Sequence, residues 1–296
     1  MAAEELGAAA GTVTAPTAAE AADVETLLVC RVHLHTLFHK LFGGAPLAEL
    51  LKELSGEETL SAVEAYAQDS QVMREVVEFL RTLGDGDARG LLDRARDEYT
   101  RLFIGPAELI AYPWESPYTN KQAAVCQEST IAVREAYRAQ GLEPRKLLRV
   151  PDDHVSLMCA FMAELGGRAL EAFLADDAAA AAKALRDQEA FVRRHMVGWL
   201  PEYARLARRS KTAVLYPQMI EACADFIALD AVFLSEAAFW LESLAEREDA
   251  ALAELAASCA DDADAPAREA LRRATARLAG MRLAGIEDNE LVAVAA

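Results

Sequence analysis

Apolar side chains recur three and four positions apart along most of this 296-residue chain, which is the spacing of one face of an α-helix. The segment 23–41 shows the pattern clearly through Leu28, Leu34 and Phe38. Ala and Leu, which favour helices, supply much of the apolar content, and no stretch alternates as a β-strand does. The sequence therefore predicts an all-α fold, with a single compact multi-helix bundle over 23–244.

The two ends of the chain depart from this pattern. Residues 1–22 are acidic and rich in Ala and Thr, without the basic cluster and apolar stretch of a signal peptide, so we expect a flexible tail. Residues 245–296 are Ala-rich and acidic, and we expect an additional C-terminal extension that is partly helical or disordered. No window of about twenty residues is apolar enough to span a bilayer. We therefore expect a cytoplasmic protein without stable membrane insertion.

The charge of the chain restricts its partners. Lys and Arg total 30 against 48 Asp and Glu, so the net charge is −18. This charge repels the phosphates of nucleic acids and anionic lipids, so we expect no nucleic-acid partner. It would favour a cationic ligand such as an arginine-rich peptide, although solubility alone also explains it.

One segment between the predicted helices is irregular and unusually aromatic. Residues 104–118 contain three prolines, through which no helix can run. The same segment carries Tyr112, Trp114 and Tyr118. Loops are usually polar, so three aromatic side chains in one loop are expected to pack on something or to bind something.

A second feature is the sequence Pro151-Asp-Asp-His154 at the start of a predicted helix. Asp152 or Asp153 can accept hydrogen bonds from the free N–H groups of the first helical turn, which alone explains an acid here. In the functional interpretation, the carboxylate and the imidazole of His154 lie side by side at an exposed helix start. Such a pair can bind a guanidinium group.

The histidines suggest an alternative function. His33, His35 and His39 cluster, and the last two could share one helical face. A helical metal-dependent hydrolase could use these residues or His154, but no motif supplies the remaining ligands. Phosphate-binding loops and a nucleophile elbow are also absent from the sequence. We therefore predict no catalytic residue, no metal site and no cofactor, and hence a protein that is not an enzyme.

Several motifs in register resemble the TorD/DmsD-type redox-enzyme maturation chaperones. The motifs are Tyr99-Thr-Arg-Leu-Phe103 with Gly105-Pro106, Pro113-Trp-Glu-Ser-Pro-Tyr118, Pro151-Asp-Asp-His154, Phe191-Val-Arg-Arg-His195 with Trp199-Leu-Pro201, and Tyr216-Pro217. They cover roughly 98–234, and the helical pattern before them fits as well. Each motif alone is weak, whereas the set in this order is specific.

The resemblance implies a chaperone that binds the twin-arginine signal peptide and the apo-form of a molybdenum-cofactor oxidoreductase. Such a chaperone assists cofactor insertion, delays export, and is a monomer or a helix-swapped dimer. The family has no catalytic residues. Its peptide-binding region carries over to the aromatic loop and the helix start, which here comprise Tyr112, Trp114, Glu115, Ser116, Tyr118, Asp152, Asp153 and His154.

Two departures from the family pattern bear on this interpretation. Val150 stands where the family usually has a Glu before the proline, so another acid, such as Asp152 or Glu115, would have to contact the ligand. The chain also continues about fifty residues past the usual end of the domain. A structural helical scaffold without peptide recognition is the third reading, and it would bury the aromatic loop inside the chain.

Overall fold

The computed structural model describes residues 18–84, 88–105, 108–119, 128–246, 263–285 and 289–294. Its helices are α1 (Ala18–Phe42), α2 (Ala48–Leu54), α3 (Glu57–Ala67), α4 (Gln71–Gly84), α5 (Ala88–Tyr99), the π-helical turn η1 (Thr100–Ile104), α6 (Ser116–Thr119), α7 (Glu128–Ala139), α8 (Val155–Leu174), α9 (Ala178–His195), α10 (Leu200–Ala207), α11 (Tyr216–Ala245) and α13 (Ala265–Gly280). Two short strands, β1 (Leu142–Pro144) and β2 (Leu291–Ala293), pair antiparallel. The all-α prediction is confirmed, and the small sheet is an addition that the sequence pattern did not predict.

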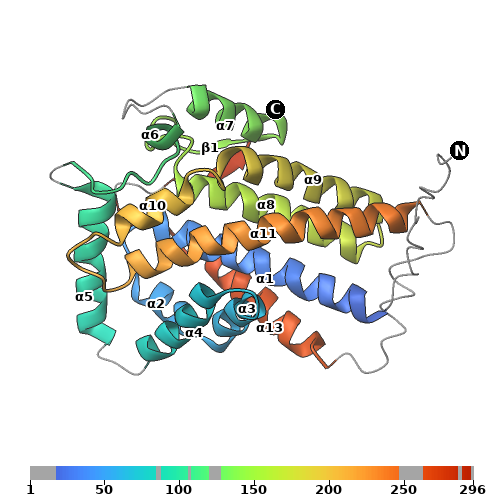
Figure 1. Ribbon diagram of the computed structural model, residues 1–296, viewed down its shortest axis with the longest axis horizontal. Coiled ribbons are helices and arrows are strands. Elements are labelled where there is room, and N and C mark those ends of the chain that lie inside the picture. The colour runs from blue at the N-terminus through green and yellow to red at the C-terminus, as the bar shows by residue number, and fades with distance from the viewer. Residues whose placement is uncertain are drawn as a thin grey trace, which may run out of the picture.

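Four long helices, α1, α8, α9 and α11, run along the long axis of the molecule, and α5 lies across one end (Figure 1). Helix α1 packs against α8, and α9 packs against both α8 and α11. From Leu28 to Phe42 every side chain of α1 except Val32 is buried. A helix surrounded in this way occupies the centre of a core rather than its surface.

The start of α1 differs slightly from expectation. The helix begins at Ala18, so residues 18–22 of the predicted flexible tail are helical, and residues 1–17 lie outside the described part of the chain. The Ala-rich sequence favours helix, and Glu20 in the first turn suits the positive end of the helix dipole. In the described part of the chain, no helix has the length and apolar character needed to cross a membrane.

A buried polar network joins three of the long helices. Arg31 of α1 donates through Nε and Nη2 to the two carboxylate oxygens of Asp230 of α11, at 2.8 and 2.9 Å. Its Nη1 donates to Gln188 Oε1 of α9 at 2.6 Å, and His35 Nε2 lies 3.1 Å from Asp230 Oδ2. Burial by itself would raise the pKa of Asp230, but the charge of Arg31 and the hydrogen bond with His35 hold it well below its usual range.

A second buried carboxylate fixes the start of α11. Glu98, at the end of α5, is fully buried and accepts hydrogen bonds from the backbone N–H groups of Val214, Leu215 and Tyr216 at 2.7–2.9 Å. Those of Leu215 and Tyr216 belong to the helix start, whose first N–H groups have no partner within the helix. Pro217 follows in the first turn, where its missing N–H costs nothing. The carboxylate therefore ties α5 to the longest helix.

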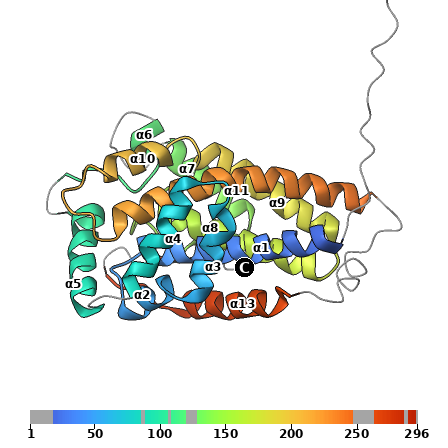
Figure 2. The same ribbon diagram turned by 60° about the horizontal axis from the view of Figure 1, so that its bottom comes forward.

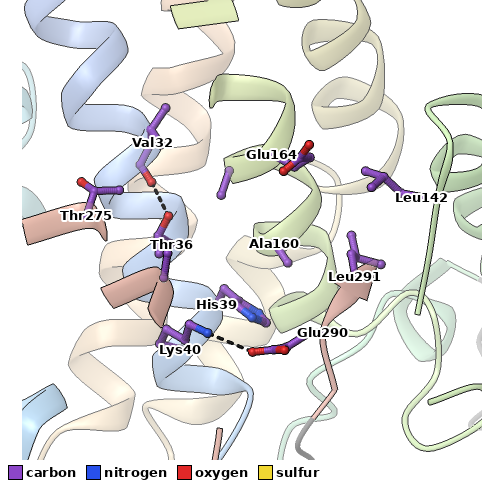
Figure 3. A pocket seen from close by; sticks show the side chains of 12 residues that line it. Val32, Thr36, His39, Lys40, Leu142, Ala160, Glu164, Thr275, Glu290 and Leu291 are labelled. Carbon is purple, nitrogen blue, oxygen red and sulfur yellow. Dashed lines mark hydrogen bonds and ion pairs between the residues drawn. The ribbon is translucent and has the colours of Figure 1, made fainter. Parts of the chain in front are cut away.

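The C-terminal segment packs onto the bundle rather than extending away from it. Helix α13 lies along α1 and α3 (Figure 2), and Arg277 forms a bidentate ion pair with Glu53 at 2.9 and 3.0 Å. Strand β2 pairs with β1, and Lys40 of α1 meets Glu290 at 3.1 Å beside a cavity of about 360 Å³ (Figure 3). The described residues beyond 262 therefore cover one face of α1, whereas residues 247–262 lie outside the described part.

The network around Arg31 predicts a large loss of stability when its carboxylate is removed. Asp230→Ala leaves a buried guanidinium without a counter-ion, and we expect it to lower the free energy of unfolding by about 3–5 kcal/mol. Chemical denaturation measures the loss. Glu78→Ala removes one half of an exposed ion pair with Arg81 and should change stability far less. Equal losses in the two variants would contradict the central role of the network.

Candidate functional site

The aromatic loop lies directly beside the start of α8. Val155 donates its backbone N–H to the carbonyl of Pro113 at 2.8 Å, and Glu115 donates to the carbonyl of Asp153 at 3.1 Å. Trp114 and His154 thus form an isolated antiparallel bridge. The two segments, 112–118 and 151–155, lie about forty positions apart in sequence but side by side in the structure. We call the region that they form the corner.

Asp153 holds this corner together. Its side chain is fully buried, and Oδ2 accepts hydrogen bonds from the backbone N–H of Ser116, at 2.8 Å, and from the Ser116 hydroxyl. Oδ1 accepts from the hydroxyl of Thr130 in α7 at 3.1 Å. Hydrogen bonds to a carboxylate are stronger than neutral ones, so a single side chain anchors the loop, α7 and the start of α8.

The cap of α8 is His154 rather than either aspartate. Its Nδ1 accepts a hydrogen bond from the backbone N–H of Ser156 at 3.2 Å. The expectation that Asp152 or Asp153 caps this helix is wrong, because the helix begins at Val155 and the capping position falls on the histidine. The helix start is also buried rather than exposed. Burial, together with the nearby His39, lowers the pKa of His154 to about 3, so the imidazole is neutral.

A third sequence motif joins the same corner from the end of α9. His195 Nδ1 lies 3.1 Å from Glu115 Oε2, and both side chains are buried. The indole N–H of Trp199 donates to the carbonyl of His195 at 2.6 Å. The Trp199 ring stacks on Tyr118, with 5.3 Å between centroids. The motifs that lie far apart in sequence therefore meet around the aromatic loop.

The aromatic side chains of the loop remain partly at the surface. Tyr112, Trp114 and Tyr118 are half-buried, and the rings of Tyr112 and Trp114 lie 5.1 Å apart. The Tyr118 hydroxyl donates to the carbonyl of Tyr112 at 2.8 Å. Within the described residues, the buried indole N–H of Trp114 has no hydrogen-bond partner. Ring faces held in this way can stack on an apolar or guanidinium group.

A cavity of about 260 Å³ adjoins the other side of the corner. Thr130 and Arg134 of α7 line one wall, and residues 148–152 line the other. Asp152 is almost fully buried and pairs with the Arg134 guanidinium. Burial raises the pKa of Asp152, and although Arg134 lowers it, the net shift is upward.

The eight residues predicted for the site divide into two groups. Three are half-buried aromatic residues, and five are buried: Glu115, Ser116, Asp152, Asp153 and His154. The structure brings all eight residues to the corner. The five buried residues, however, already form hydrogen bonds or ion pairs with other residues of the same chain. Sequence reasoning missed Thr130 and Arg134, because nothing in their local pattern connects α7 with the segment 151–154.

The histidines considered for a metal site are engaged elsewhere. His33 lies between the hydroxyls of Thr59 and Thr275, at 2.9 and 3.0 Å, and His39 Nδ1 lies 3.0 Å from the carbonyl of Ser156. His35 belongs to the network with Asp230. Among the residues that the structure describes, no group of three or more His, Cys, Asp or Glu side chains could hold a metal ion.

The chain resembles known chaperones in sequence. Residues 63–205 match the family described as nitrate reductase delta subunit. Chaperone protein TorD of Vibrio cholerae serotype O1 is 29% identical over 196 residues, which are 66% of this chain and 82% of that protein. The probable Tat proofreading chaperone DmsD of Haemophilus influenzae is 32% identical over 89 residues, or 29% of this chain and 44% of that protein. The DmsD of Salmonella paratyphi A is 34% identical over 71 residues, or 23% and 35%.

The fold and the corner define a class of helical-bundle proteins in which a proline- and aromatic-rich loop is tied to the start of a central helix. In sequence the chain is similar to one group of that class, the TorD and DmsD chaperones.

The neutral cap of α8 predicts sensitivity to acid. An unfolded histidine has a pKa near 6.5, whereas the pKa of His154 in the folded chain is about 3. Below about pH 6.5 the unfolded state takes up a proton that the folded state does not, so stability falls as the pH falls, by up to about 1.4 kcal/mol per unit. His154→Asn keeps a capping side chain without the titration.

We expect the free energy of unfolding to fall less steeply in His154→Asn than in the wild type between about pH 6.5 and about pH 4.5. Urea denaturation across this range measures the two slopes. Parallel curves would show that His154 is not kept neutral by the fold.

Proposed function

We propose that this chain is a cytoplasmic chaperone for a molybdenum-cofactor oxidoreductase. It binds the twin-arginine signal peptide and the apo-form of that enzyme, assists cofactor insertion and delays export. The relatives named as TorD chaperones and Tat proofreading chaperones support this proposal. The role requires no catalysis by the chain itself, and the client oxidoreductase is the partner.

The arrangement of the corner is the observation that carries the proposal. A twin-arginine signal offers two guanidinium groups beside an apolar stretch, and guanidinium groups both stack on aromatic rings and pair with carboxylates. Half-buried Tyr112 and Trp114 offer rings on one side. Asp152 offers a carboxylate in the cavity on the other side. The net charge of −18 attracts a cationic peptide at long range.

Within this proposal the eight predicted residues have two kinds of role. Tyr112, Trp114, Tyr118 and Asp152 contact the peptide. Glu115, Ser116, Asp153 and His154 position the loop, which agrees with their burial and their hydrogen bonds within the chain. A scaffold without peptide recognition would bury the aromatic residues as well, so their partial exposure favours a receptor.

The proposal extends to the organisation of the chain. Residues 23–244 form the chaperone domain, 1–22 an N-terminal tail and 245–296 an extension. The domain acts as a monomer or as a helix-swapped dimer, for which the segment 141–151 between α7 and α8 offers a hinge. Size-exclusion chromatography with light scattering distinguishes these two states.

The proposed contact surface predicts selective binding of an arginine peptide. The probe is a synthetic peptide with two adjacent arginines followed by an apolar stretch, measured by isothermal titration. We expect Trp114→Ala to weaken binding roughly tenfold, because the stacking face is lost, and added salt to weaken it as well. Trp240→Ala is the matched control, since Trp240 is a half-buried tryptophan of α11 outside the site.

A second control peptide carries two lysines in place of the arginines. It should bind more weakly, because lysine lacks the planar guanidinium group, which stacks on rings and presents several N–H donors. Equal affinity of the two peptides, or unchanged binding by Trp114→Ala, would refute the assigned contact surface.

A further inference from the structure

The cavity beside Asp152 already contains a guanidinium group from the chain itself. Arg134 of α7 donates through Nε to Asp152 Oδ2, and it is the only ion-pair partner of Asp152 among the described residues. The two side chains differ in freedom, because Arg134 is 28% exposed whereas Asp152 is 1% exposed. The carboxylate is fixed in the interior, and the arginine reaches it from the surface.

The backbone of Asp152 is tied to the interior of the protein. The hydroxyl of Tyr137, itself fully buried, donates to the backbone carbonyl of Asp152 at 2.9 Å. The neighbouring residue Asp153 is held by the hydrogen bonds that anchor the loop. A buried carboxylate without a counter-ion is costly. A cation next to Asp152 offsets this cost, and in the structure Arg134 supplies it.

Apart from Thr130 and Asp152, the cavity of about 260 Å³ is lined by apolar and cationic side chains. Leu148, Val150 and Pro151 supply apolar surface, and exposed Arg149 adds a further positive charge at the rim. Val150 stands at the position where similar chaperones usually have a Glu, so the cavity lacks the second carboxylate that a Glu would add. A second guanidinium group beside Arg134 would be repelled by it, because like charges repel each other strongly in a confined space.

We propose that Arg134 occupies the position that an arginine of the signal peptide takes, so that binding exchanges one guanidinium group for another. This inference rests on the proposed function. The bound peptide arginine pairs with Asp152 and lies against the apolar wall, and Arg134 turns outward into water. The exchange selects for arginine over lysine, because a planar guanidinium group can donate to Asp152 as Arg134 does while its face lies against the apolar wall.

The test compares two arginines of the same helix. Arg134→Met removes the guanidinium and keeps an unbranched apolar side chain. Arg138→Met removes an exposed charge one turn away, which acts on Asp152 only at a distance and forms no ion pair with it. We expect Arg134→Met to tighten binding of the two-arginine peptide roughly tenfold, because the internal competitor is gone. Arg138→Met should tighten it much less. Adding Asp152→Asn to Arg134→Met should abolish the gain.

Equal tightening by the two methionine variants would mean a general charge effect and would overturn the exchange. Unchanged or weaker binding by folded Arg134→Met would also overturn it. Arg134→Lys gives a second, milder variant, in which we expect an intermediate affinity, because a lysine competes without the planar fork. A Lys variant that binds as tightly as the Met variant would count against competition at Asp152.

A second probe separates this inference from the proposed function. Methylguanidinium carries the recognised group without any peptide, and NMR titration follows its binding. We expect millimolar binding to Arg134→Met and none to the wild type or to Arg138→Met. If the wild type binds no signal peptide but Arg134→Met binds methylguanidinium, the proposed function fails and the guanidinium position stands. If Arg134→Met binds no methylguanidinium, the inference fails whatever the peptide does.

Discussion

The buried pair of Arg31 and Asp230 determines how the long helices can be arranged. Two opposite charges buried in the core are stable only when each charged group has well-placed hydrogen-bond partners. The bidentate contact, together with Gln188 and His35, satisfies them across α1, α9 and α11. Apolar packing alone tolerates helices that slide or rotate slightly, whereas the directed hydrogen bonds of this network favour the observed register. The same register positions the start of α8 and the end of α9, and therefore the corner that they form with the aromatic loop.

Asp153 repeats the same principle on a local scale. A buried carboxylate again joins three segments, here the aromatic loop, α7 and the start of α8. The loop contains three prolines, and in its described part only the short turn of α6 at its end is helical, so most of its backbone groups need other partners. Tying it to Asp153 and to the bridge with α8 supplies those partners. The loop is thereby ordered enough to present aromatic faces at the surface.

The periodicity of the sequence predicted the helical class and the major helices, because apolar spacing reports directly on which face of a helix is buried. It also singled out the aromatic loop and the segment 151–154, which the structure brings together. It could not predict the burial of His154 or the role of Arg134, because both depend on contacts between distant segments. A pair of adjacent acids before a helix reads as a cap from local rules alone.

The acidity of the chain and the chemistry of its corner therefore act over different distances. The net charge of −18 attracts any cation at long range, so it cannot discriminate arginine from lysine. Discrimination requires a desolvated carboxylate with fixed geometry, and Asp152 in its cavity has that character. A free buried carboxylate would cost stability, so the fold supplies its own counter-ion from α7. In the proposed exchange, recognition at Asp152 is then a competition between two arginines rather than the filling of an empty pocket.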